Sequence, residues 1–581
     1  MRASMSKIKN IWFFVSLSAL FAVIVCGIWR DRETWKDENT FFLRYRQDGA
    51  VQWIKGFSSD GVLYFCLPSY MEPEDVTVEL PRSRKLSADG EALAFGNGDG
   101  LNGIVFNKEY QMRIESGDGR GEAFSVVFMR GSAIPAVWLD TASGGLEHIL
   151  AQKGNSEGGY MQVVDAEGRT DCMVKVDGVS GRGNTAWDAV KKSFTVKLDG
   201  AEDVLGMGAE KTWVLNANYY DGAYVRNQIG FEMAAAGGIA FVPEARFVDL
   251  YINGEYMGLY QLTEKLKVGK NRVDIGNRYF LEVDYRERAA EEEACIMLSN
   301  DQPVVIHAPA KDRDVEGVRR FFDAFGRQME EGDVPVGNLD MESFAGMFVM
   351  EDILQDMDFG FTSHYMYLDL EKEILYDGPV WDLDNTMGRG NVKEAEPLFV
   401  TDYDLVYNNV SRWYRRLCER EDFCRLAAGE YREKFRPALK WLAEGGVRER
   451  VREIEDSIAM DARRFTGSRS LFMGDASLEE HVEYLENYLK DKLEVMDAVY
   501  GEDMWKNVRG TALPALERQA SAFEDAAETQ INGTGTENGG TETGWLHVLM
   551  KYRFPVILLV MGIGGVILWY QCRNGYQGAG K

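Results

Sequence analysis

The stretch ARFVDLYINGEYMGLYQLTEK, residues 245–265, lies near the middle of the 581-residue chain. Asn253 and Gly254 separate two segments that are rich in apolar, β-branched and aromatic residues. Asn-Gly between such segments is the strongest short-range signal for a β-hairpin, because both residues tolerate the positive φ angles of a tight turn. The pattern therefore predicts two antiparallel strands, the second of which runs to Glu264 and Lys265.

Outward from this hairpin, strands and helices mix on its N-terminal side, and helices dominate on its C-terminal side. A domain begins near Ile134 with strand-like segments, and a helix is expected over 223–237. After about residue 313, apolar residues recur at helical spacing, first in VEGVRRFFDAF and again in residues 481–501. The fold class that we expect is α+β, with a main domain over 133–510.

The region before this domain has a different pattern. Short strands broken by Gly, Asp and Pro fill residues 40–132, which predicts a small β-sandwich. It carries no constellation of catalytic residue types, so we expect a spacer or a binding module. On the other side of the main domain, a Gly/Thr/Asn-rich composition predicts a flexible tether over 511–545.

Two uncharged apolar runs, at residues 11–29 and 554–570, have about the length that a helix needs to cross a bilayer. We therefore expect transmembrane segments over 1–30 and 546–571. Basic residues precede the first run and follow the second, which predicts that both termini are cytoplasmic. The large middle region would then lie outside the cytoplasm, tethered to the cell membrane at both ends.

The charge balance bears on the choice of partners. The chain has 65 Lys and Arg residues against 93 Asp and Glu residues, a net charge of −28. Such a charge repels phosphate backbones, so we expect no nucleic-acid partner, and it favours cationic ones. An acidic surface that only keeps the protein soluble would have the same composition.

The first stretch whose residue types suggest a ligand-binding role is VSGRGNTAWDAVKKSFTVKLD, residues 179–199. Gly181 and Gly183 flank Arg182 in an expected turn, and the strand that follows alternates so that Lys197 faces away from its apolar neighbours. An Arg in a glycine turn and a Lys on the next strand are suited to phosphate oxygens. An ordinary glycine turn before an exposed lysine fits the same residues.

Polar residues also fall on two expected helices. Asp221 can cap a helix that carries Arg226 and Asn227, whose side chains would reach either a ligand or solvent. Further on, Asp340 is a plausible N-cap for a helix whose apolar face includes Glu351. A carboxylate on an apolar face is a candidate for a functional site, although the rim of the core would also accommodate it.

Aspartates follow this second helix in two places. Asp356 and Asp358 stand where the helix should end, and a carboxylate is unfavourable at the negative end of a helix. In GPVWDLDNTMG, residues 378–388, a strand would place Asp382 and Asp384 on one face, where two carboxylates suit Mg²⁺ or Mn²⁺. Taken alone, this Asp-x-Asp fits a surface pair, a nucleotide-sugar transferase or a phosphotransferase.

Several segments, taken in order, resemble the signature segments of the CotH kinase family, the spore-coat protein H-like proteins. They cover roughly residues 134–400 and extend toward 500: GRGNTAW, KKSFTVKL, WVLNANYYDG, VRNQIGFEM, FVDLYINGEYMGLYQLTEK, NRVDI and GPVWDLD. The resemblance implies a divergent protein-kinase-like fold that uses ATP. Members of this family are secreted, surface or spore-coat proteins, and some phosphorylate serines in basic coat proteins.

The resemblance also implies roles for individual residues. Asp358 matches the aspartate that begins the catalytic loop. Arg182 would touch phosphates, Lys197 would be the phosphate-pairing lysine, and Glu264 would lie at the hinge on the adenine side. Asp384, assisted by Asp382, matches the aspartates that hold the metal.

The chain departs from the family pattern at one metal position. Many members place an asparagine five residues after the loop aspartate, and this chain has Ser363 there. A serine hydroxyl is a weaker neutral ligand than an amide oxygen. The chain also lacks the HRD and DFG motifs of ordinary protein kinases.

The sequence therefore predicts a membrane-tethered, Mg²⁺-dependent kinase that transfers the γ-phosphate of ATP to serines in basic segments of surface or spore-coat proteins. A non-catalytic surface protein that keeps the same fold and binds an envelope or host ligand is the main alternative. A glycosyltransferase with an Asp-x-Asp metal site is a third reading, but it would not need both Arg182 and Lys197.

Overall fold

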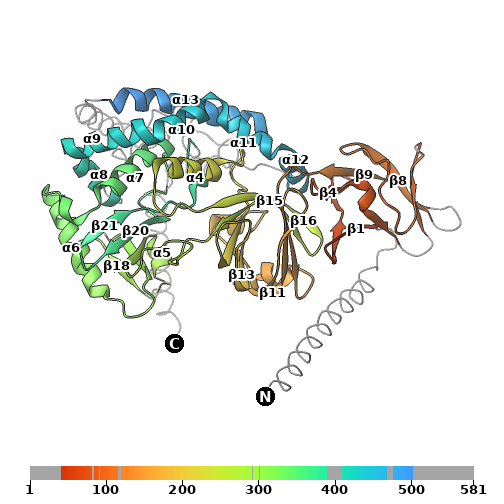
Figure 1. Cartoon of the computed structure of the whole chain (residues 1–581), viewed down its shortest axis with the longest axis horizontal. Coiled ribbons are helices and arrows are strands. Elements are labelled where there is room, and N and C mark those ends of the chain that lie inside the picture. Colours follow the sequence, from red (N-terminus) through yellow and green to blue (C-terminus); the bar gives the residue numbers. More distant parts are fainter. Residues whose placement is uncertain are drawn as a thin grey trace, which may run out of the picture. The chain divides into compact units, whose positions relative to one another are not determined.

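The computed structural model describes most of the chain between residues 41 and 501 (Figure 1), namely residues 41–80, 84–90, 92–115, 121, 123–290, 292, 294–299, 301–356, 358–388, 409–466 and 476–501. All of them belong to one compact unit, residues 1–512. Both predicted transmembrane segments and the predicted tether lie outside the described residues. Within the described ranges, no helix is both long enough and apolar enough to cross a membrane.

The hairpin predicted from Asn253–Gly254 is confirmed. β15 (Ala245–Ile252) pairs antiparallel with β16 (Glu255–Glu264), and both turn residues have positive φ. This hairpin completes a closed sheet of seven strands, because β16 also pairs with β14. Its other strands are β10 (Ala136–Thr141), β11 (Ser156–Val164), β12 (Thr170–Arg182), β13 (Ser193–Glu202) and β14 (Glu210–Asn216).

Alternation along these strands fills the interior of the closed sheet with apolar side chains. Phe194, Val196 and Leu198 of β13 point inward, and Trp213 and Leu215 of β14 meet them there. Consecutive residues of a strand point to opposite faces. The residues between them therefore point outward. One of these is Lys197 of β13, which we predicted to bind phosphate.

The N-terminal region packs against strands that continue the closed sheet. Its six-stranded sheet packs against β2, β1 and β5, which continue the large sheet beyond β16. The rings of Trp138 and Tyr251 stack within its apolar core with centroids 4.0 Å apart, and Met460 also belongs to that core. The strands are β1 (Phe42–Gln47), β2 (Ala50–Lys55), β3 (Phe57–Ser59), β4 (Val62–Leu67), β5 (Thr77–Glu79), β6 (Lys85–Ala88), β7 (Ala94–Phe95), β8 (Glu109–Glu115) and β9 (Ala123–Arg130).

A five-stranded sheet with helices against it forms the remaining part. The strand order is β18 (Cys295–Met297), β19 (Pro303–Ala308), β17 (Tyr279–Val283), β20 (His364–Asp369) and β21 (Ile374–Asp377). Figure 1 shows most of the helices gathered on one side of the molecule. They are α4 (Arg226–Gly237), α6 (Val315–Glu331), α7 (Met341–Leu354), α8 (Asn409–Cys418), α9 (Glu421–Glu430), α10 (Arg436–Trp441), α11 (Val447–Glu453) and α13 (Leu478–Val499). Helix α12 (Glu455–Arg464) packs instead on β16 and the N-terminal sheet.

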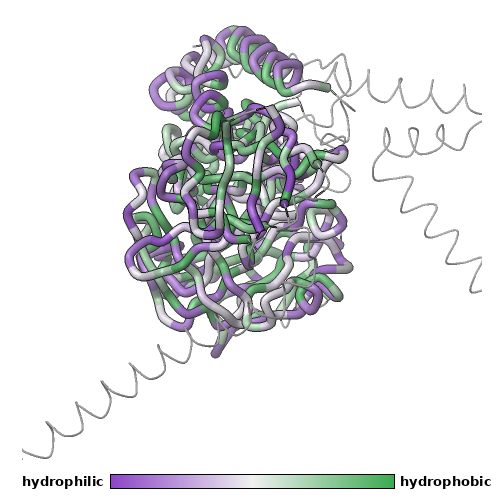
Figure 2. The backbone as a smooth tube through the Cα atoms, turned by 90° about the vertical axis from the view of Figure 1, so that its right-hand side faces the viewer, coloured by the Kyte–Doolittle hydropathy of each residue, from purple (hydrophilic) through white to green (hydrophobic). Residues whose placement is uncertain are grey.

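The mixed α/β content and the helices α6 and α13 agree with the sequence patterns. Asp340 caps α7 as predicted, because its carboxylate accepts the N–H of Ser343 at 2.9 Å. Hydrophilic and hydrophobic residues alternate along the outer helices in Figure 2, as expected where one helix face packs on a core. That core includes Phe321, Phe348 and Leu485, one from each of three helices.

Candidate active site

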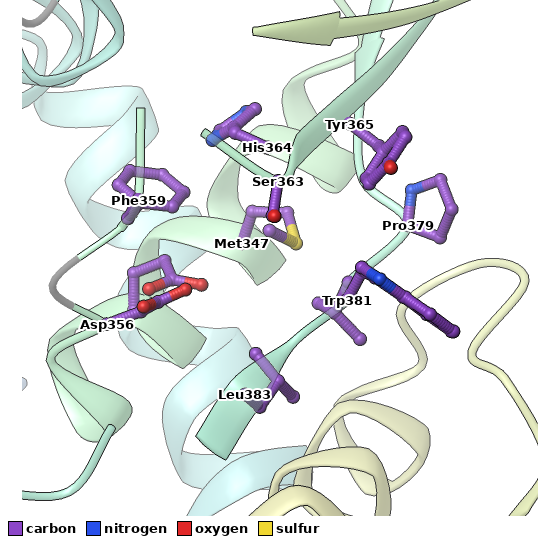
Figure 3. Close-up of a pocket in the computed structure, with 11 residues that line it drawn as sticks. Met347, Asp356, Phe359, Ser363, His364, Tyr365, Pro379, Trp381 and Leu383 are labelled. Atoms are coloured by element: carbon purple, nitrogen blue, oxygen red, sulfur yellow. The ribbon is translucent and has the colours of Figure 1, made fainter. Parts of the chain in front are cut away.

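A pocket opens where the end of α7, the loop after it and the segment after β21 meet. Phe359 and Asp356 lie on one side of it, and Tyr365, Pro379 and Trp381 lie on the other (Figure 3). Ser363 and Met347 lie between them. The remaining lining residues are Glu351, His364, Val380 and Leu383.

The segment GPVWDLD is not a strand, so the prediction that Asp382 and Asp384 share one strand face is wrong. β21 ends at Asp377, Asp382 has a φ of 61°, and Asp384 lies in a short 3₁₀ helix, Leu383–Asn385. The physical reason is the hydrogen-bond partner of the backbone in this segment. The N–H of Leu383 donates to the side chain of Asn227 at 2.8 Å rather than to a neighbouring strand.

Asn227 belongs to a buried network of amide side chains that ties α4 to the closed sheet. Its amide donates to Asn218 at 3.1 Å, and Asn218 donates to Gln261 of β16 at 3.5 Å. The guanidinium of Arg226, the preceding residue, pairs with Asp221 and donates from Nε to the carbonyl of Thr386 at 3.1 Å. Arg226 and Asn227 therefore reach the aspartate segment rather than solvent, and they hold its backbone.

Hydrogen bonds from Asp358 connect the loop after α7 with the segment that contains Asp382 and Asp384. Its N–H donates to the carboxylate of Asp356 at 3.0 Å, and its own carboxylate accepts from the amide of Asn385 at 3.4 Å. The structure thus brings Asp358, the predicted loop aspartate, beside the segment that carries Asp382 and Asp384. Asn385 was not predicted from the sequence as a site residue, although it stands directly after the Asp-x-Asp.

Behind Asp358, the pocket wall contains buried acids. The residue exposures of Glu351 and Asp356 are 2% and 6%. Burial raises the pKa of each carboxyl well above its usual range, and neighbouring carboxylates raise it further. One oxygen of Glu351 and Nδ1 of His364 are buried without a hydrogen-bond partner. Glu351, a site candidate by sequence, does line the pocket.

His364 and Ser363 complete this wall. Nε2 of His364 lies 2.8 Å from Asp377, whose other oxygen accepts the hydroxyl of Tyr414. Ser363 lines the pocket with a φ of 53°. Within the described ranges, no group of three or more His, Cys, Asp and Glu residues is arranged to hold a metal ion.

Arg182, at the end of β12, does not line the pocket but lies over Trp381, which does. It donates to Asn216 at 2.9 Å, and its guanidinium lies 5.5 Å from the centre of the Trp381 ring. Burial lowers the pKa of Arg182, and the charge of Asp382 opposes that shift. The structure therefore brings Arg182 together with Trp381 and Asp382.

The other two predicted nucleotide contacts are placed differently. Lys197 is exposed on the outer face of β13 and does not line the pocket. Glu264 pairs with Arg272, which lies over Trp213 at one end of the closed sheet, and it accepts the N–H of Glu244 at 2.9 Å. Burial raises the pKa of Glu264. Structural partners thus occupy both oxygens of this carboxylate.

Comparison with known proteins agrees with these features. The family model described as CotH kinase protein matches residues 179–496, more than half of the chain. The protein therefore belongs to the CotH kinase family. A search of curated proteins found no match.

Proposed function

We propose that this protein is a kinase that transfers the γ-phosphate of ATP to serine hydroxyls of surface or spore-coat proteins. The observation that carries the proposal is the position of Asp358. Asp356 and Asn385 hold it between the loop after α7 and the Asp-x-Asp segment, and Arg182 lies over Trp381 of the pocket wall. A carboxylate, an aspartate pair and a cation are the parts that phosphoryl transfer requires. Here they do not line the pocket themselves but stand next in sequence to its lining residues or, for Arg182, over one of them.

In this proposal, Asp358 orients the acceptor hydroxyl and takes its proton. The acceptor oxygen forms a bond to the γ-phosphorus as the bond between that phosphorus and the bridging oxygen of ADP breaks. Arg182 binds phosphate oxygens and balances their charge. The buried amide network around Asn227 keeps the Asp-x-Asp segment in place during this step.

The donor set suits Mg²⁺ when the ion arrives with a nucleotide. Mg²⁺ is commonly bound by one or two carboxylates together with substrate phosphates, so a cage of three protein ligands is not required. Asp384 and Asp382 would supply the carboxylate oxygens, and Ser363 offers a neutral hydroxyl. Bound Mg²⁺ would neutralise charge on the phosphate oxygens. Mn²⁺ has the same ligand preferences.

The cellular setting is also a proposal. The apolar runs at 11–29 and 554–570 support a protein anchored in the cell membrane with its pocket outside the cytoplasm. The net charge of −28 supports protein substrates with basic segments around the acceptor serine.

The experiment is phosphoryl transfer from labelled ATP by the purified full-length protein, with Mg²⁺ and a Lys/Ser-rich peptide. We expect transfer to serine that stops when Mg²⁺ is chelated. A non-catalytic binding protein is the second candidate, and Ser363 in place of the family's asparagine favours it. Nucleotide binding without transfer to any hydroxyl peptide or protein would support that candidate instead.

A further inference from the structure

The loop that follows α7 folds into a short turn before β20 begins. The N–H groups of Phe361 and Thr362 both donate to the carbonyl of Asp358, at 2.9 and 3.0 Å. The backbone position of Asp358 is therefore tied to that of Thr362. Phe359 within this turn and Ser363 directly after it line the pocket (Figure 3).

The side chain of Thr362 is anchored outside this turn. Its hydroxyl donates to the carboxylate of Asp284 at 2.7 Å and accepts from the guanidinium of Arg288 at 2.7 Å. Asp284 and Arg288 also pair directly, at 3.1 Å. Thr362 is 6% exposed and Asp284 is 5% exposed, so water competes little with these hydrogen bonds.

Strand pairing places the anchoring residues beside the turn. β17 ends at Val283, which stands opposite His364, the first residue of β20. Asp284 follows Val283, and Thr362 comes shortly before His364. In an antiparallel pair, these positions lie at the same end of the two strands. The five-stranded sheet therefore supports the turn through the hydroxyl of Thr362.

We propose that Thr362 is a positioning residue whose buried hydroxyl holds the turn that presents Asp358 to the acceptor. The inference rests on the proposed function for the role of Asp358. The turn fixes the backbone of Asp358, and the amide of Asn385 contacts its carboxylate at 3.4 Å. Both constraints matter for transfer, because a displacement of about 1 Å at a reacting group can slow a reaction ~10²-fold.

Thr362→Val tests this role, because it removes the hydroxyl and keeps the shape of the side chain. Asp284 retains the guanidinium of Arg288 and accepts the N–H of Tyr285 at 2.8 Å, so no buried carboxylate loses all its partners. The unfolding temperature should therefore fall by no more than about 4 °C. Thr362→Ser restores the hydroxyl and should restore the properties of the parent.

Thr141→Val is the matched control. The hydroxyl of Thr141 is also buried, donates to the carbonyl of Gly145 at 2.8 Å and accepts from the amide of Asn253 at 3.0 Å. Thr141 ends β10 in the closed sheet and does not line the pocket. Both valine variants lose one buried, hydrogen-bonded hydroxyl, so a difference between them is specific to the turn at Asp358.

The full-length parent and the three variants are compared by transfer from labelled ATP, by calorimetry with Mg·ATP and by hydrogen exchange. We expect Thr362→Val to lower kcat about 10- to 100-fold, because Asp358 is displaced, and to leave the Kd of Mg·ATP within about twofold. The amides in residues 358–363 should exchange faster in this variant, because their turn is less firmly held. Thr141→Val should match the parent in all three measurements.

The outcomes separate this inference from the proposed function. Unchanged kcat in Thr362→Val, or an equal loss in Thr141→Val, overturns the inference and leaves the kinase proposal standing. A loss of Mg·ATP affinity as large as the loss of kcat would assign Thr362 a general structural role and also overturn it. If the parent transfers no phosphate, the kinase proposal fails and hydrogen exchange decides the inference. Faster exchange at residues 358–363 in Thr362→Val alone then supports the positioning of this turn, and unchanged exchange overturns it.

Discussion

Two buried clusters of charged side chains in this protein differ in how completely they are satisfied. Where α12 meets β16, Lys191 pairs with Asp461 at 2.8 Å, and both side chains are fully buried. Lys191 also donates to the carbonyl of Ala217, and Asp461 accepts the N–H of Leu259. At the pocket, Glu351 and Asp356 are buried beside other carboxylates, and Glu351 retains an oxygen without a partner.

This difference suggests that the first cluster stabilises the fold and that the second serves the function of the pocket. A buried pair whose hydrogen bonds are all made holds elements together, and removing one partner leaves an uncompensated charge. Buried carboxyls that lie beside one another favour their protonated forms instead, and such groups concentrate at functional sites. We therefore expect changes in the first cluster to unfold the protein and changes around the pocket to affect its activity first.

The largest effect is expected at Asp358. Asp358→Asn keeps the shape of the side chain but cannot accept the proton of a hydroxyl, so phosphoryl transfer should fall ~10²–10⁴-fold. Binding of Mg·ATP and the unfolding temperature should remain close to those of the parent. Transfer assays, calorimetry and thermal unfolding measure the three quantities. If phosphoryl transfer is unaltered, Asp358 has a structural role rather than a catalytic one.

Lys191→Met tests the satisfied cluster. It leaves Asp461 buried without its cation, so the free energy of unfolding should fall by about 3–5 kcal/mol. Urea denaturation followed by circular dichroism gives the value. Lys192→Met is the matched control, because Lys192 is the next residue and is only partly buried. A loss below about 1 kcal/mol would place this pair with ordinary surface ion pairs.

Asp249 gives the satisfied cluster a pH dependence. Burial, opposed by hydrogen bonds from Ser457 and Tyr256, raises its pKa to about 7. The folded protein thus binds a proton between the unfolded value near 4 and about 7, so the contribution of Asp249 to stability is present at low pH and is lost as the pH rises. The expected slope is about 1.4 kcal/mol per pH unit across that window. Urea denaturation at several pH values measures it.

Asp249→Asn removes the titrating carboxyl and should flatten this slope. Neighbouring ionisable groups, including Asp461 and Lys191, remain in the variant, so the difference between the two proteins isolates Asp249. The same slope in both would show that another group titrates there.

The smallest effect is expected for Glu351→Gln. Because burial raises the pKa of Glu351 well above its usual range, the protonated carboxyl is favoured, and glutamine has a similar shape and a similar donor. The free energy of unfolding at pH 7 should change by less than about 1 kcal/mol or should increase. Glu351→Ala, which opens a cavity, should cost about 2 kcal/mol or more. A strong destabilisation by glutamine would mean that Glu351 is ionised and paired.

Much of the local structure could be predicted from the sequence. The β15–β16 hairpin, the cap at Asp340 and the helices α6 and α13 depend on residues within a few positions of one another. The same local reasoning identified Glu351 as unusual, because a carboxylate interrupts an apolar helical face. It failed for GPVWDLD, because a side chain on α4 rather than a neighbouring strand binds the backbone of Leu383.

The sequence by itself therefore determined the turns, the helical periodicity and the alternation of side chains, since each depends on short-range sterics and hydrogen bonds. Only the tertiary structure decided which distant residues share a site. Closure of the sheet by β14 and β16 brings Glu264 to Arg272 instead of to the pocket. The packing of α4 and α7 decides the path of the aspartate segment. These positions depend on contacts between segments far apart in the chain, and no local pattern encodes them.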